Sequence, residues 1–246
     1  MIERELQIAT AGGRPDATFL RPDGPGSWAG VLFFTDIGGI RDAYRQSARR
    51  LAGEGYAVLM PNVFYRTGKP PMFDFKPNFA EEKTLRRLGE ISGPLTPEAM
   101  ERDASTYVDF LAAQDGVRKG PMGVVGYCFT GAMAVRTAAA RPDKIAAAAS
   151  FHGGGLYTDK PTSPHLVLPR VTAQLYFGHA VEDRSMPQEA IHKLGEALNR
   201  WGGQYENDVY EGARHGWTTL DAPVYNQPQA ERAFARLSAL LAKALK

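Results

Sequence analysis

The chain has 246 residues, of which 43% are hydrophobic and 23% charged, a composition typical of one globular α/β domain with a large core. Its formal net charge of +2 excludes the strongly basic surface that attracts nucleic acid or acidic lipid. Residues 1–13 carry no apolar segment flanked by basic residues, and no stretch approaches the roughly 18 apolar residues of a membrane span. We therefore expect a cytoplasmic protein with no nucleic-acid or membrane partner.

The first part of the chain alternates short apolar runs with helical patterns, which predicts a mostly parallel sheet with helices on both faces. The run Trp28–Thr35 is almost continuously apolar, as expected of a strand buried on both faces. The expected elements are a hairpin over 3–9 and 16–21, a strand over 28–35, a helix over 42–53 and a strand over 56–61.

Residues 62–95 differ from the rest, because they combine prolines with a series of aromatic side chains. A loop of this length in a compact domain is often a lid or a substrate wall. A packed surface excursion with its own small aromatic cluster explains the composition equally well. Both interpretations stay open for this irregular, cap-like excursion.

The second part returns to regular alternation. The expected elements are a helix over 97–113, strands over 122–126, 145–151, 171–177 and 205–210, and helices over 129–140, 187–201 and 227–246. Neither an internal repeat nor a linker is visible. The sequence thus predicts a single domain over residues 1–246, with a sheet of about eight strands.

The chain has one cysteine, so it forms no internal disulfide and no multi-cysteine metal site. A lone cysteine is most often a small buried hydrophobic residue. Cys128, however, lies in a strand–turn–helix sequence between Gly126 and Gly131, the context of a nucleophile elbow. The first turn of a helix also favours a thiolate through the helix dipole. We therefore expect Cys128 to be a nucleophile.

The same turn predicts an oxyanion hole. The amide of Phe129, the residue after the nucleophile, would point at the oxygen that becomes negative when a carbonyl is attacked. The second donor should come from the loop after Thr35, where Gly38 and Gly39 permit close approach. We assign this second donor to the amide of Ile37.

Hydrolases with such an elbow place an acid and then a histidine later in the chain. Here Glu182 and Asp183 follow one predicted strand and His215 follows the next, so all lie at the carboxyl edge of the sheet. We prefer Asp183 to Glu182, because its shorter side chain orients an imidazole more tightly. Its expected role is to hold the tautomer of His215 and to stabilise the imidazolium.

The other four histidines fit this order less well. His192 lies in a charged helical segment and is expected to be solvated, and His165 lies in a proline-bounded loop without an evident partner. His152 ends a strand at the same edge as Cys128, where we favour a hydrogen-bonded structural histidine over a pocket residue. His179 precedes the acid, which is the wrong order for a base.

Five segments together make a specific pattern. They are Asp36–Gly39 ahead of Arg41, Gly55–Tyr56 with Pro61, Gly126–Cys128, Tyr176–Gly178 with Asp183 and Pro187, and Gly212–Gly216. In this pattern the chain resembles the dienelactone hydrolase family, from nearly end to end. The resemblance implies the α/β-hydrolase fold and a cysteine–histidine–aspartate triad that acts on small esters or lactones without a cofactor or metal.

The chain departs from the family pattern at three places. The family usually has glycine where Thr130 stands, which predicts a helix slightly farther from the strand. Asp36 stands where members that open dienelactones carry a glutamate that holds the thiol. Those members also bind the substrate carboxylate with arginines, one of them shortly after the histidine, where this chain reads Trp217–Leu220. The departures favour a less charged or bulkier ester. Arg41, Arg86 and Arg87 are candidate contacts for an anion, although we favour the interpretation that they are exposed side chains.

The sequence therefore predicts a carboxylic ester hydrolase whose partner is a small-molecule ester or lactone, in a monomer or homodimer. Asp36, Tyr127 and Trp217 are expected to support the site or contact the substrate. A thioesterase or a promiscuous carboxylesterase could use the same triad. An amidotransferase-like fold is disfavoured, because its histidine follows the cysteine closely. A hydrolase scaffold retained only for binding is disfavoured by the complete set of triad candidates.

Overall fold

The structure, a computed structural model, describes residues 1–245. Its sheet has eight strands in the order β1-β2-β4-β3-β5-β6-β7-β8. Neighbouring strands are parallel from β4 to β8, whereas β2 runs antiparallel to both β1 and β4. The strands are β1 (Ile2–Gln7), β2 (Asp16–Arg21), β3 (Ala29–Phe34), β4 (Tyr56–Pro61), β5 (Met122–Tyr127), β6 (Ile145–Phe151), β7 (Gln174–Glu182) and β8 (Tyr205–Arg214). The predicted, mostly parallel sheet is confirmed.

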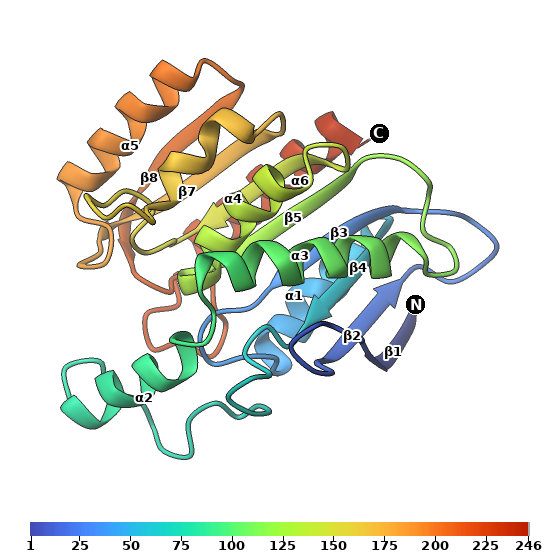
Figure 1. Cartoon of the computed structure of the whole chain (residues 1–246), viewed down its shortest axis with the longest axis horizontal. Coiled ribbons are helices and arrows are strands. Elements are labelled where there is room, and N and C mark those ends of the chain that lie inside the picture. The colour runs from blue at the N-terminus through green and yellow to red at the C-terminus, as the bar shows by residue number, and fades with distance from the viewer. Residues whose placement is uncertain (246) are drawn as a thin grey trace.

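Helices cover both faces of the sheet, as Figure 1 shows. The α-helices are α1 (Asp42–Gly53), α2 (Glu82–Ser92), α3 (Pro97–Ala112), α4 (Gly131–Ala140), α5 (Gln188–Trp201) and α6 (Gln227–Leu245), and the 3-10 helices are η1 (Cys128–Thr130) and η2 (Pro164–Arg170). Helices α3, α4 and α5 share one hydrophobic core with the sheet, and α1 and α6 share the other. No helix within residues 1–245 has the length and apolar character needed to cross a bilayer.

The central strands are buried along their whole length, which explains their nearly continuous apolar sequences. In β3 the side chains alternate between the two cores. Leu32 and Phe34 belong to the core under α3 and α4, whereas Val31 and Phe33 belong to the core under α1 and α6. Each such side chain contributes roughly 1.5–3 kcal/mol by burial, so the centre of the sheet is a rigid base for the loops at its edge.

Strands β7 and β8 continue beyond the predicted ends at Phe177 and Tyr210, and β7 begins at Gln174 and not at the predicted Val171. Their pairing shows an irregularity between Ala180 and Glu182, after which Glu182 pairs with Arg214. These extensions mix buried residues (His179, Ala180 and Ala213) with exposed ones, so they lack the continuous apolar pattern of the inner strands. Because the two strands stay paired to their ends, the loops that follow them lie side by side.

The excursion over 62–95 contains α2 and projects beyond the body of the sheet in Figure 1. Its first part is anchored to α3, where Asp103 accepts hydrogen bonds from Arg66 at 2.7 and 3.0 Å and from the Tyr65 hydroxyl at 3.2 Å. It also reaches the edge that carries the loop after β5, since the Phe64 and Phe129 ring centroids lie 6.3 Å apart. The excursion therefore borders that edge of the sheet.

Candidate active site

Cys128 occupies a strained turn between β5 and α4. It is the first residue of η1, and its φ of 57° lies in the left-handed region that non-glycine residues seldom adopt. A Cβ at Gly126 would clash with the carbonyl oxygen of Thr130, and one at Gly131 would clash with Ser150 Oγ. Glycine at these two positions thus allows strand and helix to meet closely and hold the thiol above the sheet edge.

Three side chains from distant parts of the chain meet at this turn. Cys128 Sγ lies 3.1 Å from His215 Nε2, and His215 Nδ1 lies 2.6 Å from Asp183 Oδ2. Cys128 follows β5, Asp183 follows β7 and His215 follows β8, all at the carboxyl edge of the sheet. Cys128 as a residue is partly exposed.

Asp183 is held in place by its own loop. Its Oδ1 accepts hydrogen bonds from the Ser185 amide at 2.8 Å and the Ser185 hydroxyl at 2.6 Å, which leaves Oδ2 for His215. Sequence analysis did not single out Ser185, although the Asp-x-Ser spacing is typical of a turn closed by an aspartate side chain. Glu182, the other acid considered, is exposed and lies 3.7 Å from Arg214 Nε.

The charges of these groups support one another. Burial by itself would lower the pKa of His215, but the negative charge of Cys128 and the hydrogen bond to Asp183 outweigh it and raise that pKa to about 10. Burial would raise the pKa of Asp183, but its contacts with His215 and Ser185 outweigh that effect and leave the pKa below its usual value. The arrangement favours a protonated His215 ring beside the ionised Asp183 carboxylate.

The loop after β3 forms a tight turn beside the elbow. The Gly38 amide donates to Asp36 Oδ1 at 2.8 Å, and the Gly39 amide donates to the Asp36 carbonyl at 3.0 Å. Within residues 1–245, the Ile37 amide is hydrogen-bonded to no acceptor. Phe129 is the second residue of η1, where a helix leaves its first amides without internal partners. The two amides expected as oxyanion donors thus belong to the turn after β3 and to the first turn of η1.

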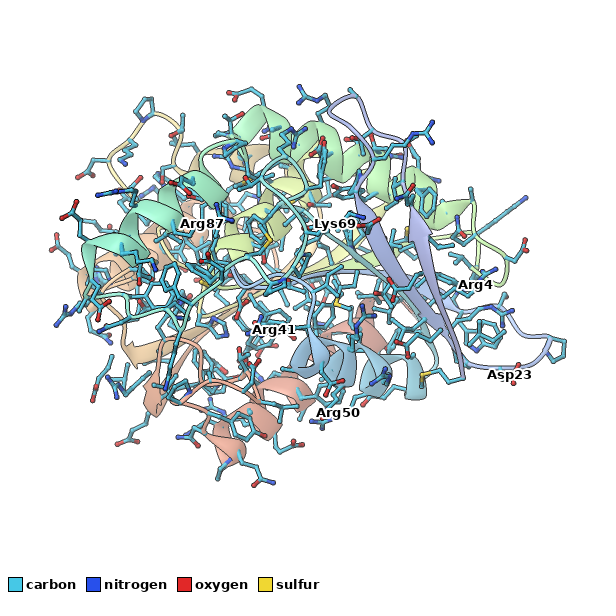
Figure 2. All side chains as sticks on the ribbon, turned by 90° about the horizontal axis from the view of Figure 1, so that it is seen from below. Arg4, Asp23, Arg41, Arg50, Lys69 and Arg87 are labelled. Carbon is cyan, nitrogen blue, oxygen red and sulfur yellow. The ribbon has the colours of Figure 1, made fainter. Side chains whose placement is uncertain are left out.

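Asp36 is engaged away from the thiol. Its two carboxylate oxygens accept hydrogen bonds from Arg41 at 2.6 and 2.9 Å, and the described residues include no hydrogen bond between Asp36 and Cys128. Arg41, labelled just before α1 in Figure 2, also donates to Asp221 at 2.7 and 3.1 Å. The guanidinium expected to be exposed is therefore mostly covered and paired with two carboxylates.

Tyr127 and Trp217 are buried behind the reacting groups. The Tyr127 ring stacks on Phe151, with centroids 5.7 Å apart, and Trp217 packs against His152 at 5.2 Å. His152 in turn lies edge-on to His215, with centroids 5.2 Å apart. Burial and the positive charge of His215 hold the pKa of His152 well below its usual value, so this ring is a neutral support.

Thr130 is a further residue whose contacts were not anticipated. Its side chain is completely buried, and its hydroxyl lies within hydrogen-bond distance of backbone atoms in both the elbow and the end of β3. A threonine at this place carries no sequence pattern for such a role. The sequence draws attention to it only as a departure from the glycine that the family usually has at this place.

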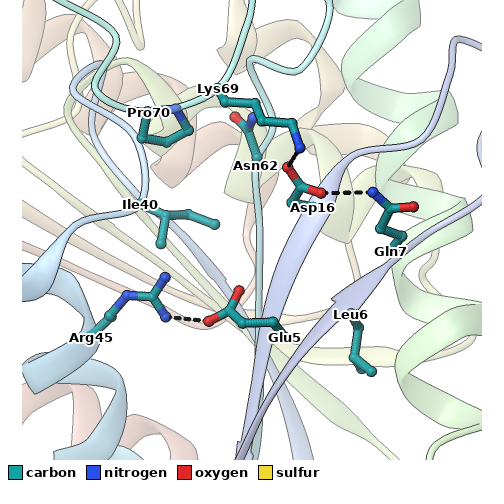
Figure 3. A pocket seen from close by; sticks show the side chains of 9 residues that line it. All are labelled: Glu5, Leu6, Gln7, Asp16, Ile40, Arg45, Asn62, Lys69 and Pro70. Carbon is teal, nitrogen blue, oxygen red and sulfur yellow. Dashed lines mark hydrogen bonds and ion pairs between the residues drawn. The ribbon is translucent and has the colours of Figure 1, made fainter.

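A separate cavity of about 420 Å³ lies between the β1–β2 hairpin, α1 and the excursion (Figure 3), and no triad residue lines it. Its charges are already paired, since Arg45 lies 2.6 Å from Glu5 and Lys69 lies 2.8 Å from Asp16. Across residues 1–245, no three His, Cys, Asp or Glu side chains are grouped as metal ligands would be. The chemistry of the molecule thus concentrates at the elbow.

Comparison with known proteins identifies the family. Residues 16–245 match the description "Dienelactone hydrolase family". The chain belongs to the dienelactone hydrolase family. Membership confirms the resemblance seen in the sequence and the prediction that the protein is an enzyme of the hydrolase class.

Individual members agree with this assignment. A carboxymethylenebutenolidase of Rhodococcus opacus is 28% identical over 193 residues, which are 78% of this chain and 71% of that protein. A Klebsiella pneumoniae structure, provisionally named a dienelactone hydrolase, aligns with a TM-score of 0.87 at 23% identity and covers 98% of both chains. A dienelactone hydrolase-like promiscuous phosphotriesterase from metagenomic libraries aligns at 0.80, with 20% identity over 99% of this chain and 98% of that one. These likenesses confirm the α/β-hydrolase fold.

Proposed function

We propose that this dienelactone hydrolase family member cleaves carboxylic ester or lactone bonds of small molecules, with Cys128 as nucleophile, His215 as general acid and base, and Asp183 as its orienting acid. The observation that carries the proposal is the pair of contacts at His215, 3.1 Å from the sulfur and 2.6 Å from the carboxylate. An imidazole between a thiol and a carboxylate, at a strained turn, is the arrangement that activates a nucleophile.

Acylation begins with the thiolate of Cys128. Its Sγ attacks the carbonyl carbon, a C–S bond forms, and the carbonyl π electrons move to the oxygen. The amides of Phe129 and Ile37 donate hydrogen bonds to that oxyanion. The intermediate then collapses: the C–O bond to the leaving group breaks, and His215 Nε2 gives its proton to the departing oxygen. The acyl group remains on Cys128 as a thioester.

Deacylation uses the same groups in reverse. Neutral His215 takes a proton from water at Nε2, and the resulting hydroxide adds to the thioester carbonyl. The second tetrahedral intermediate breaks its C–S bond, which releases the carboxylic acid product. The electron pair returns to the sulfur, so the thiolate and the imidazolium of the resting site are restored. Asp183 stabilises the imidazolium in both halves of the reaction.

The charges near the site favour a substrate without a carboxylate of its own. Arg41 is the cation on the loop that carries the proposed Ile37 donor, and both of its carboxylate partners bind it at 3.1 Å or less. A substrate carboxylate would have to displace Asp36 or Asp221 to reach this guanidinium. An uncharged ester avoids that competition, so we propose neutral aryl or alkyl esters and lactones as the preferred substrates.

The test is an activity screen with matched anionic and neutral substrates. p-Nitrophenyl acetate should be hydrolysed with a higher kcat/KM than p-nitrophenyl hemisuccinate, which adds a carboxylate to a similar acyl chain. Cys128→Ala should abolish both reactions, and unchanged turnover in this variant would overturn the nucleophile assignment. A preference for the hemisuccinate would overturn the proposed substrate class while leaving the triad intact.

Two further measurements separate the proposal from its alternatives. A screen in which acyl thioesters exceed aryl esters and lactones would identify a thioesterase that uses the same triad. Stoichiometric alkylation of Cys128 by iodoacetamide without any loss of hydrolysis would indicate that the thiol is not part of the reaction. Conversely, parallel loss of the free thiol and of esterase activity supports the proposed mechanism.

A further inference from the structure

Thr130 lies between the two backbone segments that carry the proposed oxyanion donors. It directly follows Phe129 in the elbow, while the end of β3 leads through Thr35 to Ile37. Its side chain is completely buried between these segments, so its hydroxyl is shielded from water. This position lets one side chain contact both halves of the proposed oxyanion hole.

The contacts of the hydroxyl join the segments. Thr130 Oγ1 accepts a hydrogen bond from the Tyr127 amide at 3.0 Å. Three carbonyl oxygens lie within reach of its one proton: Thr35 at 2.9 Å, Tyr127 at 2.9 Å and Phe34 at 3.1 Å. Two of these three acceptors belong to the end of β3, so the hydroxyl forms a polar link from the elbow to that strand.

This link begins where the sheet itself stops joining the two strands. The pairing of β3 with β5 ends at Phe34 and Gly126. Beyond that point one segment continues into the Ile37 turn and the other into the elbow. The separation of these two segments sets the distance between the Ile37 and Phe129 amides. A buried hydroxyl that bonds both segments fixes this separation more firmly than packing alone, because leaving the group unsatisfied would be costly.

We infer that Thr130 is a positioning residue for the oxyanion hole: its hydroxyl holds the Ile37 turn at the elbow so that the Ile37 and Phe129 amides converge on one substrate oxygen. The inference rests on the proposed function, since it concerns the same carbonyl attack. It predicts that loss of the hydroxyl impairs stabilisation of the oxyanion while the thiol and its histidine remain in place.

The test compares two reactions of the same sulfur. Hydrolysis of p-nitrophenyl acetate needs an oxyanion hole, whereas alkylation by iodoacetamide needs the thiolate but forms no oxyanion. Thr130→Val keeps the size of the side chain and loses its hydroxyl. In this variant kcat/KM for the ester should fall roughly 10- to 100-fold, which does not exceed the fall caused by removing one oxyanion donor entirely. The rate constant for alkylation should stay within about 2-fold of the original, and Thr130→Ser should restore most of the hydrolysis.

Thr137→Val is the matched control. Thr137 is equally buried on α4, and among the described residues its hydroxyl bonds only the Met133 carbonyl of the same helix, at 2.7 Å. This variant should leave both reactions within about 2-fold of the original. If Thr130→Val does not fold, Thr130→Ala and Thr130→Ser give the same comparison, because they differ by one hydroxyl.

Three outcomes would overturn the inference. Esterase activity of Thr130→Val close to that of the unmodified protein would show that the hydroxyl is dispensable. An equal fall in hydrolysis and alkylation would show that Thr130 supports the elbow as a whole. Failure of Thr130→Ser to recover activity would indicate that shape, and not the hydroxyl, matters. Retained turnover in Cys128→Ala would instead refute the proposed function, so failure of the proposed function can be told apart from failure of the inference on Thr130.

Discussion

His215 lies between two side chains that contact different ring nitrogens. Cys128 Sγ lies near Nε2, and the Asp183 carboxylate holds Nδ1. Burial works against the charged ring, yet the two neighbours outweigh it. The balance at this one residue is therefore the electrostatic basis of the proposed mechanism.

Replacing the thiol should lower the pKa of His215. The charge of Cys128 is the largest effect that raises it to about 10, so Cys128→Ser should move the titration of this ring toward neutral pH. NMR of the histidine ring protons across pH 5–11 measures the change, with His215→Gln identifying the resonance. An unchanged midpoint in Cys128→Ser would contradict an ion pair between the two side chains.

The same pKa predicts how stability depends on pH. The folded-state pKa of His215, about 10, lies above the ordinary value of 6.5. Its contribution to stability is therefore complete below about pH 6.5 and is lost as the pH rises through 10. The difference in unfolding free energy between the protein and His215→Gln should shrink over that range in urea titrations. A difference that stays constant from pH 6.5 to 10 would show that the ring is already neutral in the folded state.

Removing the carboxylate should impair catalysis more than folding. Asp183→Asn keeps the size of the side chain but no longer stabilises the imidazolium, so kcat/KM should fall at least about 100-fold. Ser185→Ala, which removes one of two bonds to Asp183 Oδ1, should cost less than about 10-fold. Esterase assays with p-nitrophenyl acetate measure both effects. Equal losses in the two variants would show that the loop geometry, and not the charge, is decisive.

At the scale of single elements, the turns of the chain were more predictable than its strand ends. Gly126 and Gly131 predict the elbow, because close contact of a strand and a helix leaves a local pattern. The ends of β7 and β8 leave none, because they mix buried and exposed residues without a regular alternation and pair with each other across an irregularity. Helix α2 was not predicted, because it lies in a segment rich in proline and aromatic residues that the sequence marks as irregular.

Two glycine-to-alanine substitutions should have opposite effects on stability. In Gly126→Ala the new Cβ meets the Thr130 carbonyl, so the elbow must distort and both stability and activity should fall. In Gly89→Ala the Cβ enters open space within α2, and alanine should raise the unfolding free energy by up to about 1 kcal/mol. Urea denaturation measures the stability of both variants, and esterase assays measure their activity. Stabilisation by Gly126→Ala would show that the elbow accommodates the added Cβ without distortion.

At the scale of the whole molecule, the sheet order explains why the candidate triad could be predicted while its surroundings could not. Strands β5, β7 and β8 end at one edge, so residues that follow them must meet there. The partners of Asp36 depend instead on how loops far apart in sequence pack. Its link through Arg41 to Asp221 joins residues 36 and 221, and no local pattern encodes that contact.

The excursion over 62–95 should depend on one buried ion pair. Asp103 is almost completely buried and accepts both Arg66 hydrogen bonds, so Asp103→Ala would leave a largely covered guanidinium without its partner. We expect a loss of roughly 3 kcal/mol in unfolding free energy, measured by urea denaturation. Glu82→Gln, which breaks an exposed pair with Arg86, should cause no measurable change. Equal stability of the two variants would show that the excursion is held by packing alone.

The single cysteine of the chain has a consequence for oxidative damage. Peroxide converts an accessible thiolate to a sulfenic acid, and many proteins then protect it by forming a disulfide with a neighbouring thiol. This chain has no second thiol to do so. Rescue must come from a small external thiol, and without one the sulfenic acid proceeds to the irreversible sulfinic form. Peroxide-treated enzyme should regain activity when glutathione is added immediately, before the sulfenic acid is oxidised further. It should not regain activity when glutathione is added late. Equal recovery at both times would show that the sulfur resists oxidation beyond the sulfenic acid.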